Sequence, residues 1–130
     1  MKKYECKPTQ ESMMDVIQFV EDTVSDANVP AKIAMQVNVA VDEIYSNILH
    51  YSRASKASVE ISTEANNVML RFIDDGVPYD PTKIDNPDTT LSADEREIGG
   101  LGIFMVKKSM DEMSYEFRDG CNVLTISKSF

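Results

Sequence analysis

The stretch Ile98-Gly99-Gly100-Leu101-Gly102-Ile103-Phe104-Met105-Val106 contains three of the five glycines of the chain within four positions. Glycine allows the backbone to approach a ligand closely, and the apolar run that follows predicts a helix directly behind the glycines. The unpaired N–H groups and positive dipole end of a helix N-terminus favour a phosphate, although a tight loop without a ligand is the alternative. The stretch lacks the Gly-Lys-Ser/Thr of a P-loop and the third glycine of a dinucleotide fingerprint. If phosphates bind here, the metal ligand and the base must therefore come from elsewhere in the chain.

Composition limits the classes of protein to consider. The chain has 130 residues, 42% hydrophobic and 27% charged, which predicts one domain over residues 1–130. Its net charge of -9 argues against a nucleic acid or an anionic membrane as partner and favours a basic protein surface. No apolar run has the length of a signal-peptide core or a transmembrane helix, so we expect a cytoplasmic protein. Cys6 and Cys121 lack metal-ligand spacing and are expected to be reduced thiols in strands.

Hydrophobic periodicity predicts an order of helices and strands. Apolar residues recur at helical spacing in two long segments before residue 53, and alternation of apolar with polar residues marks the strands that follow. Asn66-Asn67 and Asp119-Gly120 are turn pairs that tolerate positive φ, so each predicts an antiparallel hairpin. The expected elements are strand 2–7, helix 10–27 with Thr9 as its N-cap, helix 31–52, strands 58–64 and 68–73, a helix from the glycine stretch to about residue 112, and strands 114–118 and 122–127.

Glu43 and Asn47 lie four residues apart on one face of the second predicted helix, away from its packing side. Asparagine is a poor helix former, so Asn47 is either solvated or binds a ligand. For an isolated pair of this kind, the solvated interpretation is the more common. His50 is the only histidine, and no second residue of metal-binding type accompanies it, which disfavours a metal site there.

The strand 68–73 leads directly into Asp74-Asp75-Gly76-Val77-Pro78. A carboxylate at the end of a central strand points outward at the rim of a cleft, whereas the alternative is that the two aspartates only open a turn. Residues 79–97 follow with many acids and little periodicity. Such a length is unusual for a connection in a compact domain and is typical of a lid or a disordered segment.

In their order and spacing, these signals resemble the GHKL, or Bergerat-type, ATP-binding domain shared by sensor histidine kinases, type II topoisomerases, mismatch-repair ATPases and heat-shock chaperones. The resemblance covers residues 9–128 and is strongest to the small anti-sigma factor serine kinases of bacteria. Asp42-Glu43-Ile44-Tyr45-Ser46-Asn47 matches the N-box of the family, Asp74-Asp75-Gly76-Val77-Pro78 its first glycine box, and Gly99-Gly100-Leu101-Gly102 its second. Pro78 stands where many members have a second glycine.

The resemblance implies roles for residues of the first two motifs. Asn47 would bind Mg²⁺ through its amide oxygen, because Mg²⁺ takes oxygen ligands and bridges phosphates. Glu43, one turn earlier, would accept the proton of the attacking hydroxyl. Asp74 would accept a charge-assisted hydrogen bond from the adenine amino group, and Gly76 would let the chain turn close to the base.

The resemblance also implies a site for the phosphates of ATP. A lid over about residues 80–98 would cover them, and its single arginine, Arg96, either contacts phosphate or is solvated. The residues expected to bind the phosphates through the second glycine box are Gly100, Leu101 and Gly102.

The implied fold is α+β, a two-layer sandwich whose mixed, mostly antiparallel sheet carries helices on one face. The implied activity is that of an ATP-dependent serine/threonine protein kinase that binds a sigma factor and phosphorylates an anti-sigma factor antagonist, and a homodimer is left open.

A histidine kinase would need an upstream helical hairpin with a phosphoacceptor histidine, and a topoisomerase or mismatch-repair ATPase would need a transducer domain. The alternative is a non-catalytic module that sequesters a partner in an ATP-dependent manner. The presence of both Glu43 and Asn47 disfavours it, because a pure binder needs no base.

Overall fold

The computed structural model describes residues 1–83 and 100–130. Arg96 and residues 84–98 of the expected lid lie outside the described residues. Among the helices described, none has both the length and the apolar character needed to cross a membrane. The elements are, in chain order, β1 (Lys2–Cys6), α1 (Gln10–Asp26), α2 (Ala31–Asn47), η1 (Ile48–Ser52), β2 (Ala57–Ser62), η2 (Glu64–Asn66), β3 (Asn67–Asp74), η3 (Pro81–Lys83), α3 (Gly100–Ser109), β4 (Glu112–Arg118) and β5 (Cys121–Ser129).

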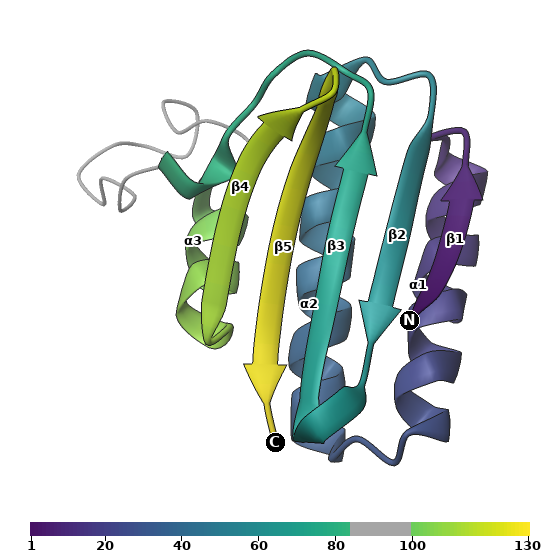
Figure 1. Ribbon diagram of the computed structural model, residues 1–130, viewed down its shortest axis with the longest axis vertical. Coiled ribbons are helices and arrows are strands. Elements are labelled where there is room, and N and C mark those ends of the chain that lie inside the picture. The colour runs from purple at the N-terminus through teal and green to yellow at the C-terminus, as the bar shows by residue number, and fades with distance from the viewer. Residues whose placement is uncertain (84–99) are drawn as a thin grey trace.

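The five strands form one sheet in the order β1-β2-β3-β5-β4, visible side by side in Figure 1. All four neighbouring pairs are antiparallel. The expected α+β sandwich is confirmed, but its sheet is antiparallel throughout the described residues rather than mixed. The reason is the connectivity: β2–β3 and β4–β5 are hairpins, and β5 re-enters the sheet beside β3 in the opposite direction.

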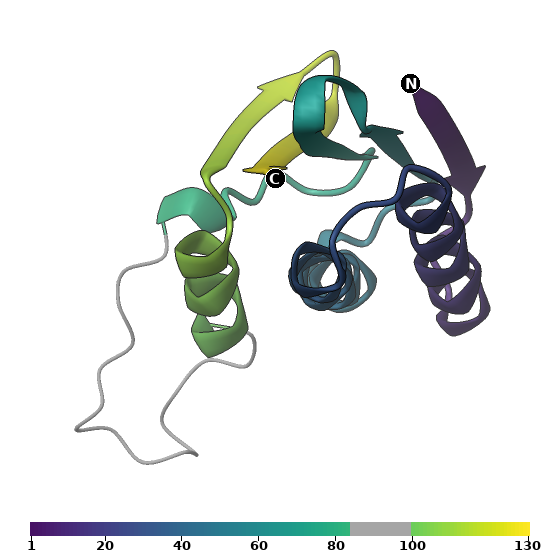
Figure 2. The same cartoon turned by 90° about the horizontal axis from the view of Figure 1, so that it is seen from below.

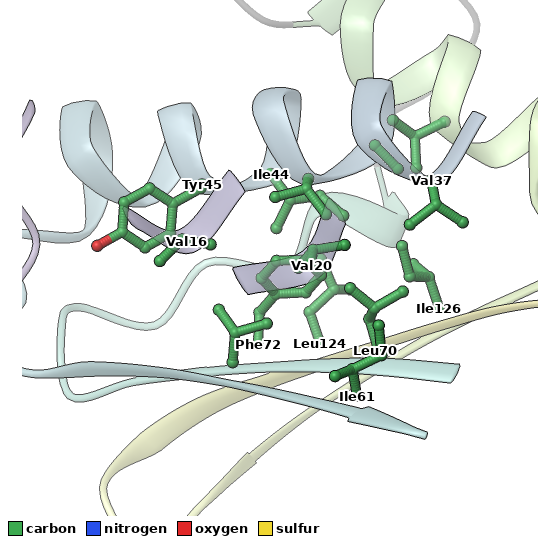
Figure 3. Close-up of a cluster of buried hydrophobic side chains, with 14 of the residues drawn as sticks. Val16, Val20, Val37, Ile44, Tyr45, Ile61, Leu70, Phe72, Leu124 and Ile126 are labelled. Carbon is green, nitrogen blue, oxygen red and sulfur yellow. The ribbon is translucent and has the colours of Figure 1, made fainter. Parts of the chain in front are cut away.

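The three α-helices cover the same face of the sheet, as Figure 2 shows. The apolar side of α2, including Val37 and Ile44, packs with Leu70, Phe72 and Ile126 from β3 and β5 (Figure 3). Burying one aliphatic or aromatic side chain of this kind contributes about 1.5–3 kcal/mol. The shared core therefore holds α2 in a defined position against the sheet.

A buried polar cluster joins the N-terminal elements. Thr9 caps α1 as predicted, since its side chain accepts a hydrogen bond from the backbone N–H of Ser12 at 3.0 Å. The hydroxyl of Tyr45 on α2 lies 2.7 Å from Ser12 Oγ and 3.1 Å from Cys6 Sγ. Cys6 and Cys121 are both free thiols on strands, as expected.

The second helix differs from its prediction at its C-terminal end. It is α-helical only to Asn47 and continues as one π-helical turn, Ile48–Ser52, before Arg53 ends it with a φ of 55°. Ile48 is buried, so the apolar period of the helix continues into this turn. The sequence pattern therefore does not indicate that the backbone changes from α-helical to π-helical geometry. Single π-turns of this type are frequent at functional sites.

The predicted hairpins are confirmed with shifts of one or two residues. Asp119 and Gly120 both have positive φ in the β4–β5 turn. In the β2–β3 turn, however, the positive φ values fall on Ala65 and Asn66, one residue earlier than the predicted pair Asn66-Asn67. The third helix ends at Ser109, and β4 begins two residues earlier than predicted.

Candidate functional site

A pocket lies between the C-terminal end of α2, the inner face of the sheet and α3. Its wall is apolar in large part, and Asn47 and Asp74 both line it although they come from different elements. An apolar cleft with a few convergent polar groups is the usual form of a small-molecule site. The full set of lining residues is Ile44, Asn47, Ile48, Ser52, Phe72, Asp74, Tyr79, Pro81, Ile103, Tyr115, Asn122 and Leu124.

Asp74 ends β3 and is only 5% exposed. Its Oδ1 accepts hydrogen bonds from the Gly76 backbone N–H and from Asn122 Nδ2, each at 3.0 Å. Burial raises the pKa of the Asp74 carboxyl, while hydrogen bonds from Asn122, Gly76 and Ser52 oppose this shift. A buried carboxylate held in one orientation by donors is suited to accept a hydrogen bond from a ligand.

Asp75, the next residue, points to a different part of the fold. Its exposed carboxylate accepts hydrogen bonds from Ser55 N at 2.7 Å, Ser55 Oγ at 2.6 Å and Lys56 N at 3.0 Å. These hydrogen bonds lower the pKa of the Asp75 carboxyl, and the bond from the Ser55 side chain makes the largest contribution. Of the two alternatives left open by the sequence, the cleft position therefore applies to Asp74 and the turn position to Asp75.

Asn122 is a pocket residue that sequence reasoning missed. Its Nδ2 donates to Asp74 Oδ1 at 3.0 Å and to the Val77 carbonyl at 2.8 Å. Its Oδ1 accepts from the Tyr79 backbone N–H at 3.0 Å and from the Tyr115 hydroxyl. The side-chain amide thus joins Asp74, the segment that follows it and Tyr115 on β4.

A signal for Asn122 was nevertheless present in the sequence. In β5 the residues that face the helices alternate, and Leu124 and Ile126 belong to the buried core. Asn122 continues this alternation and is 5% exposed, so a polar side chain stands at a position where the pattern favours an apolar one. A buried polar residue in a core-facing register needs partners, which here are the groups around Asp74.

Gly76 lies against the end of the π-helical turn. A Cβ built on Gly76 would overlap the backbone of Ser52, lying 2.6 Å from its carbonyl carbon. The Ser52 carbonyl also accepts a hydrogen bond of 2.7 Å from the Val77 N–H. Glycine is therefore needed at this position because the loop after β3 packs against the end of the π-helical turn.

Glu43 and Gly102 are in direct contact, since a Cβ on Gly102 would overlap the Glu43 carboxylate. Burial raises the pKa of Glu43, and the neighbouring Asp42 adds to the increase. Asn47 follows one turn later on α2. The structure thus brings Glu43 to the first turn of α3, beside the pocket that Asn47 lines.

The predicted helix behind the glycine cluster is confirmed. α3 begins at Gly100 and includes Leu101 and Gly102 in its first turn, where backbone N–H groups lack intrahelical partners. Near the other end of α3, Lys107 Nζ donates to the Thr82 carbonyl at 3.0 Å, which attaches the described start of the expected lid to this helix.

A family model described as the histidine kinase-like ATPase domain matches residues 6–128 of the chain. The chain belongs to this family of ATPase domains. It is 26% identical over 127 residues to the serine/threonine-protein kinase BtrW of Bordetella bronchiseptica, in an alignment that covers 95% of this chain and 89% of BtrW. Membership of the histidine kinase-like ATPase family implies ATP as the ligand.

Solved structures show the same histidine kinase-like ATPase fold. The structure of the RsbU and RsbW domains of Rv1364c from Mycobacterium tuberculosis superposes with a TM-score of 0.65 at 12% identity, covering 99% of this chain and 32% of that one. A chain of the SiaB–SiaC complex from Pseudomonas aeruginosa superposes with a TM-score of 0.64 at 14% identity, covering 100% of this chain and 90% of that one.

The described residues of this ATPase domain are suited to bind Mg²⁺ only when phosphate groups supply further ligands to the ion. No group of three or more His, Cys, Asp or Glu side chains in residues 1–83 and 100–130 is arranged to hold a metal ion. Mg²⁺ is usually bound by one or two protein oxygens together with phosphates and water. The amide of Asn47, at the pocket wall, fits this kind of coordination.

Proposed function

We propose that this chain is an ATP-dependent serine/threonine protein kinase that acts as an anti-sigma factor and phosphorylates an anti-sigma factor antagonist. The observation that carries the proposal is the contact of Glu43 with Gly102 in the first turn of α3. Glu43 lies one helical turn before Asn47 on α2. In this arrangement Glu43 would act as a proton acceptor beside N–H groups that have no intrahelical partner and suit phosphate. A module that only binds nucleotide has no need of the proton acceptor.

Glu43 is the proposed general base. Its raised pKa makes the carboxylate a stronger proton acceptor than an ordinary glutamate. In the transfer, Glu43 takes the proton of a serine or threonine hydroxyl, and the hydroxyl oxygen forms a bond to the γ-phosphorus. The bond between the γ-phosphorus and the bridging oxygen breaks, and ADP leaves.

Asn47 and the start of α3 are proposed to hold the phosphates. Asn47 would bind Mg²⁺ through its amide oxygen, and the ion supplies neutralisation of phosphate charge when bound. Arg96 is proposed as a further phosphate contact. The backbone donors at the helix N-terminus would be those of Gly100, Leu101 and Gly102.

Asp74 is proposed to bind the adenine. Its carboxylate would accept a hydrogen bond from the amino group of the base, and Asn122 and the Gly76 N–H would hold the carboxylate in place. The apolar residues of the pocket, such as Ile103 and Leu124, would contact the faces of the ring.

The proposed partners are a sigma factor and an antagonist protein, in the cytoplasm. Two comparisons support a protein substrate, since BtrW is named a serine/threonine-protein kinase and SiaB is solved in a complex with SiaC. The net charge of -9 favours a basic protein surface over nucleic acid or membrane. A homodimer is compatible with the proposal.

Incubation of the protein with γ-labelled ATP, Mg²⁺ and candidate antagonist proteins tests the proposal. We expect label on a serine or threonine of one antagonist, with loss of label when Glu43 is replaced by Gln. ATP-dependent binding of a partner without any transfer of label would instead identify a sequestering module.

A further inference from the structure

Two exposed apolar side chains lie beside the contact between Glu43 and Gly102. Val39 precedes Glu43 by one helical turn on α2 and is 57% exposed. Met105 follows Gly102 by three residues on α3 and is 54% exposed. Single exposed apolar residues are normal, whereas apolar side chains that gather at one place on a surface mark a site of interaction. Neither residue belongs to the three motifs.

The helices α2 and α3 run in opposite directions, as Figure 1 shows. α2 leads to the end of the sheet where β3 ends, because the Ser52 carbonyl accepts a hydrogen bond from the loop after β3. α3 leads to the opposite end, where the Asp111 N–H donates to the Ser127 carbonyl and β4 begins. One turn back along α2 and one turn forward along α3 therefore lead in the same direction, so Val39 and Met105 lie on the same side of the contact.

The side chains that follow these two residues face the opposite way. Ala40 and Val106 come directly after Val39 and Met105 and are buried in the shared core. Val39 and Met105 therefore face outward, away from the sheet, and Met35 extends this surface by one more turn of α2 with 69% exposure. We call Met35, Val39 and Met105 the outer apolar patch.

The outer apolar patch begins where a protein hydroxyl would have to reach Glu43. Glu43 is half-buried against Gly102, and the pocket proposed for the nucleotide lies between the helices and the sheet. With the nucleotide in that pocket, an acceptor protein approaches Glu43 from the outer side of the helices. A chain whose hydroxyl lies about 3 Å from the Glu43 carboxylate would also cover side chains one helical turn, about 6 Å, away.

We propose that the outer apolar patch binds an apolar side chain next to the phosphoacceptor serine or threonine of the antagonist protein and so selects the residue that is phosphorylated. The inference rests on the proposed function, in which Glu43 is the base. Three side chains are far fewer than the roughly 20–30 residues that each partner contributes to a stable interface. A second copy held on the patch would also block the approach of a protein hydroxyl to Glu43. The patch therefore fits a substrate that binds transiently.

The test uses the antagonist protein that takes up label from γ-labelled ATP. Transfer rates at varied antagonist concentration and ATP affinity by calorimetry are measured for the wild type, Val39→Gln, Met105→Gln and Met14→Gln, with a thermal melt of each. Glutamine forms helices well, so the fold should be kept. We expect the first two variants to raise the KM for the antagonist about tenfold, the scale for burying one aliphatic side chain, without a change in ATP affinity. Met14, which is 71% exposed on α1, is the matched control and should have no effect.

A double-mutant cycle identifies the side chain that occupies the patch. Each apolar residue near the labelled serine or threonine of the antagonist is replaced by Gln. For the residue that contacts the patch, the replacement should raise the KM with the wild-type kinase but add little with Met105→Gln. Fully additive effects for every such residue would overturn the proposed contact.

The outcomes separate this inference from the proposed function. If the wild type labels no antagonist, the proposed function fails and the inference fails with it. If the wild type labels an antagonist, but Val39→Gln and Met105→Gln keep its KM or Met14→Gln raises the KM equally, only the role of the patch is overturned. Met105→Leu keeps an apolar surface and should retain the wild-type KM. Should Val39→Gln fail to fold, Val39→Thr, which has nearly the shape of valine, provides the same comparison.

Discussion

The carboxylate of Glu43 occupies the space in which a side chain on Gly102 would begin. The C-terminal part of α2 and the first turn of α3 therefore touch at a point where residue 102 must lack a Cβ. In the proposed mechanism this contact sets the base beside the N–H groups that bind phosphate. Gly102 of the second glycine box would thus help to position the general base, Glu43, as well as to bind the phosphates.

Replacing Gly102 by Ala should displace Glu43, because the new methyl group and the carboxylate cannot share the same space. We expect phosphotransfer to fall on the order of 100-fold, the scale for a misplaced reacting group. The free energy of unfolding should also decrease by about 1–3 kcal/mol, as for an overpacked site. In a Glu43→Ala background the same substitution should cost much less, and fully additive stability losses in this cycle would refute the contact.

Replacing Asp74 by Asn should weaken ATP binding by about 1.5–3 kcal/mol, because a carboxylate acceptor is lost. Asp75→Asn provides the matched control, since it removes the same charge one residue later from a carboxylate that bonds only to Ser55 and Lys56 among the described residues. Calorimetry with ATP should show the loss for the first variant alone. Equal effects of the two substitutions would mean that charge, rather than contact with the base, governs binding.

Replacing Asn122 by Ala should destabilise the fold and weaken ATP binding together. The substitution removes the hydrogen bonds that Asn122 makes with the Val77 carbonyl and the Tyr79 N–H, at a cost of about 0.5–1.5 kcal/mol for each bond lost. Asn67→Ala is the control, because among the described residues its side chain makes only one long hydrogen bond, accepted from Ser129 Oγ at 3.4 Å. Denaturant unfolding of both variants should show a clearly larger loss at residue 122, and similar small losses would contradict the account of Asn122.

The pH dependence of transfer should reflect the raised pKa of Glu43. A general base acts when deprotonated, so the rate at saturating ATP should fall as pH decreases through a value above the ordinary glutamate pKa of about 4.3. The folded state also binds this proton more tightly than the unfolded chain. Its contribution to stability is therefore present at low pH and lost as pH rises through the folded pKa. A rate profile without this acidic limb would argue against Glu43 as the base.

The sequence predicted the helices, the hairpins and the motif positions because these depend on local patterns. Periodicity located α1 and α2, and Asp119-Gly120 located the last turn. The π-helical turn after Asn47 was not predictable in this way, since Ile48 extends the apolar period of an ordinary helix.

Contacts between segments that are distant in the chain could not be predicted from the sequence either. Spacing placed Glu43 and Gly102 in separate motifs, but only the packing of α2 on α3 shows that they touch. Asn122 contacts Asp74, and Ser52 contacts Val77 in the loop after it, from segments with no motif of their own. Their partners become evident only when β3 and β5 pair and the π-helical turn meets the Gly76 loop.

The central claim is that Glu43 takes the proton in a phosphotransfer reaction, and Glu43→Gln tests it most directly. The variant keeps the size of the side chain beside Gly102 but cannot accept a proton at neutral pH. With ATP affinity and phosphorylation of an antagonist measured on the same preparation, we expect affinity near that of the wild type and transfer lower by on the order of 100-fold or more. Full transfer by Glu43→Gln would contradict the claim.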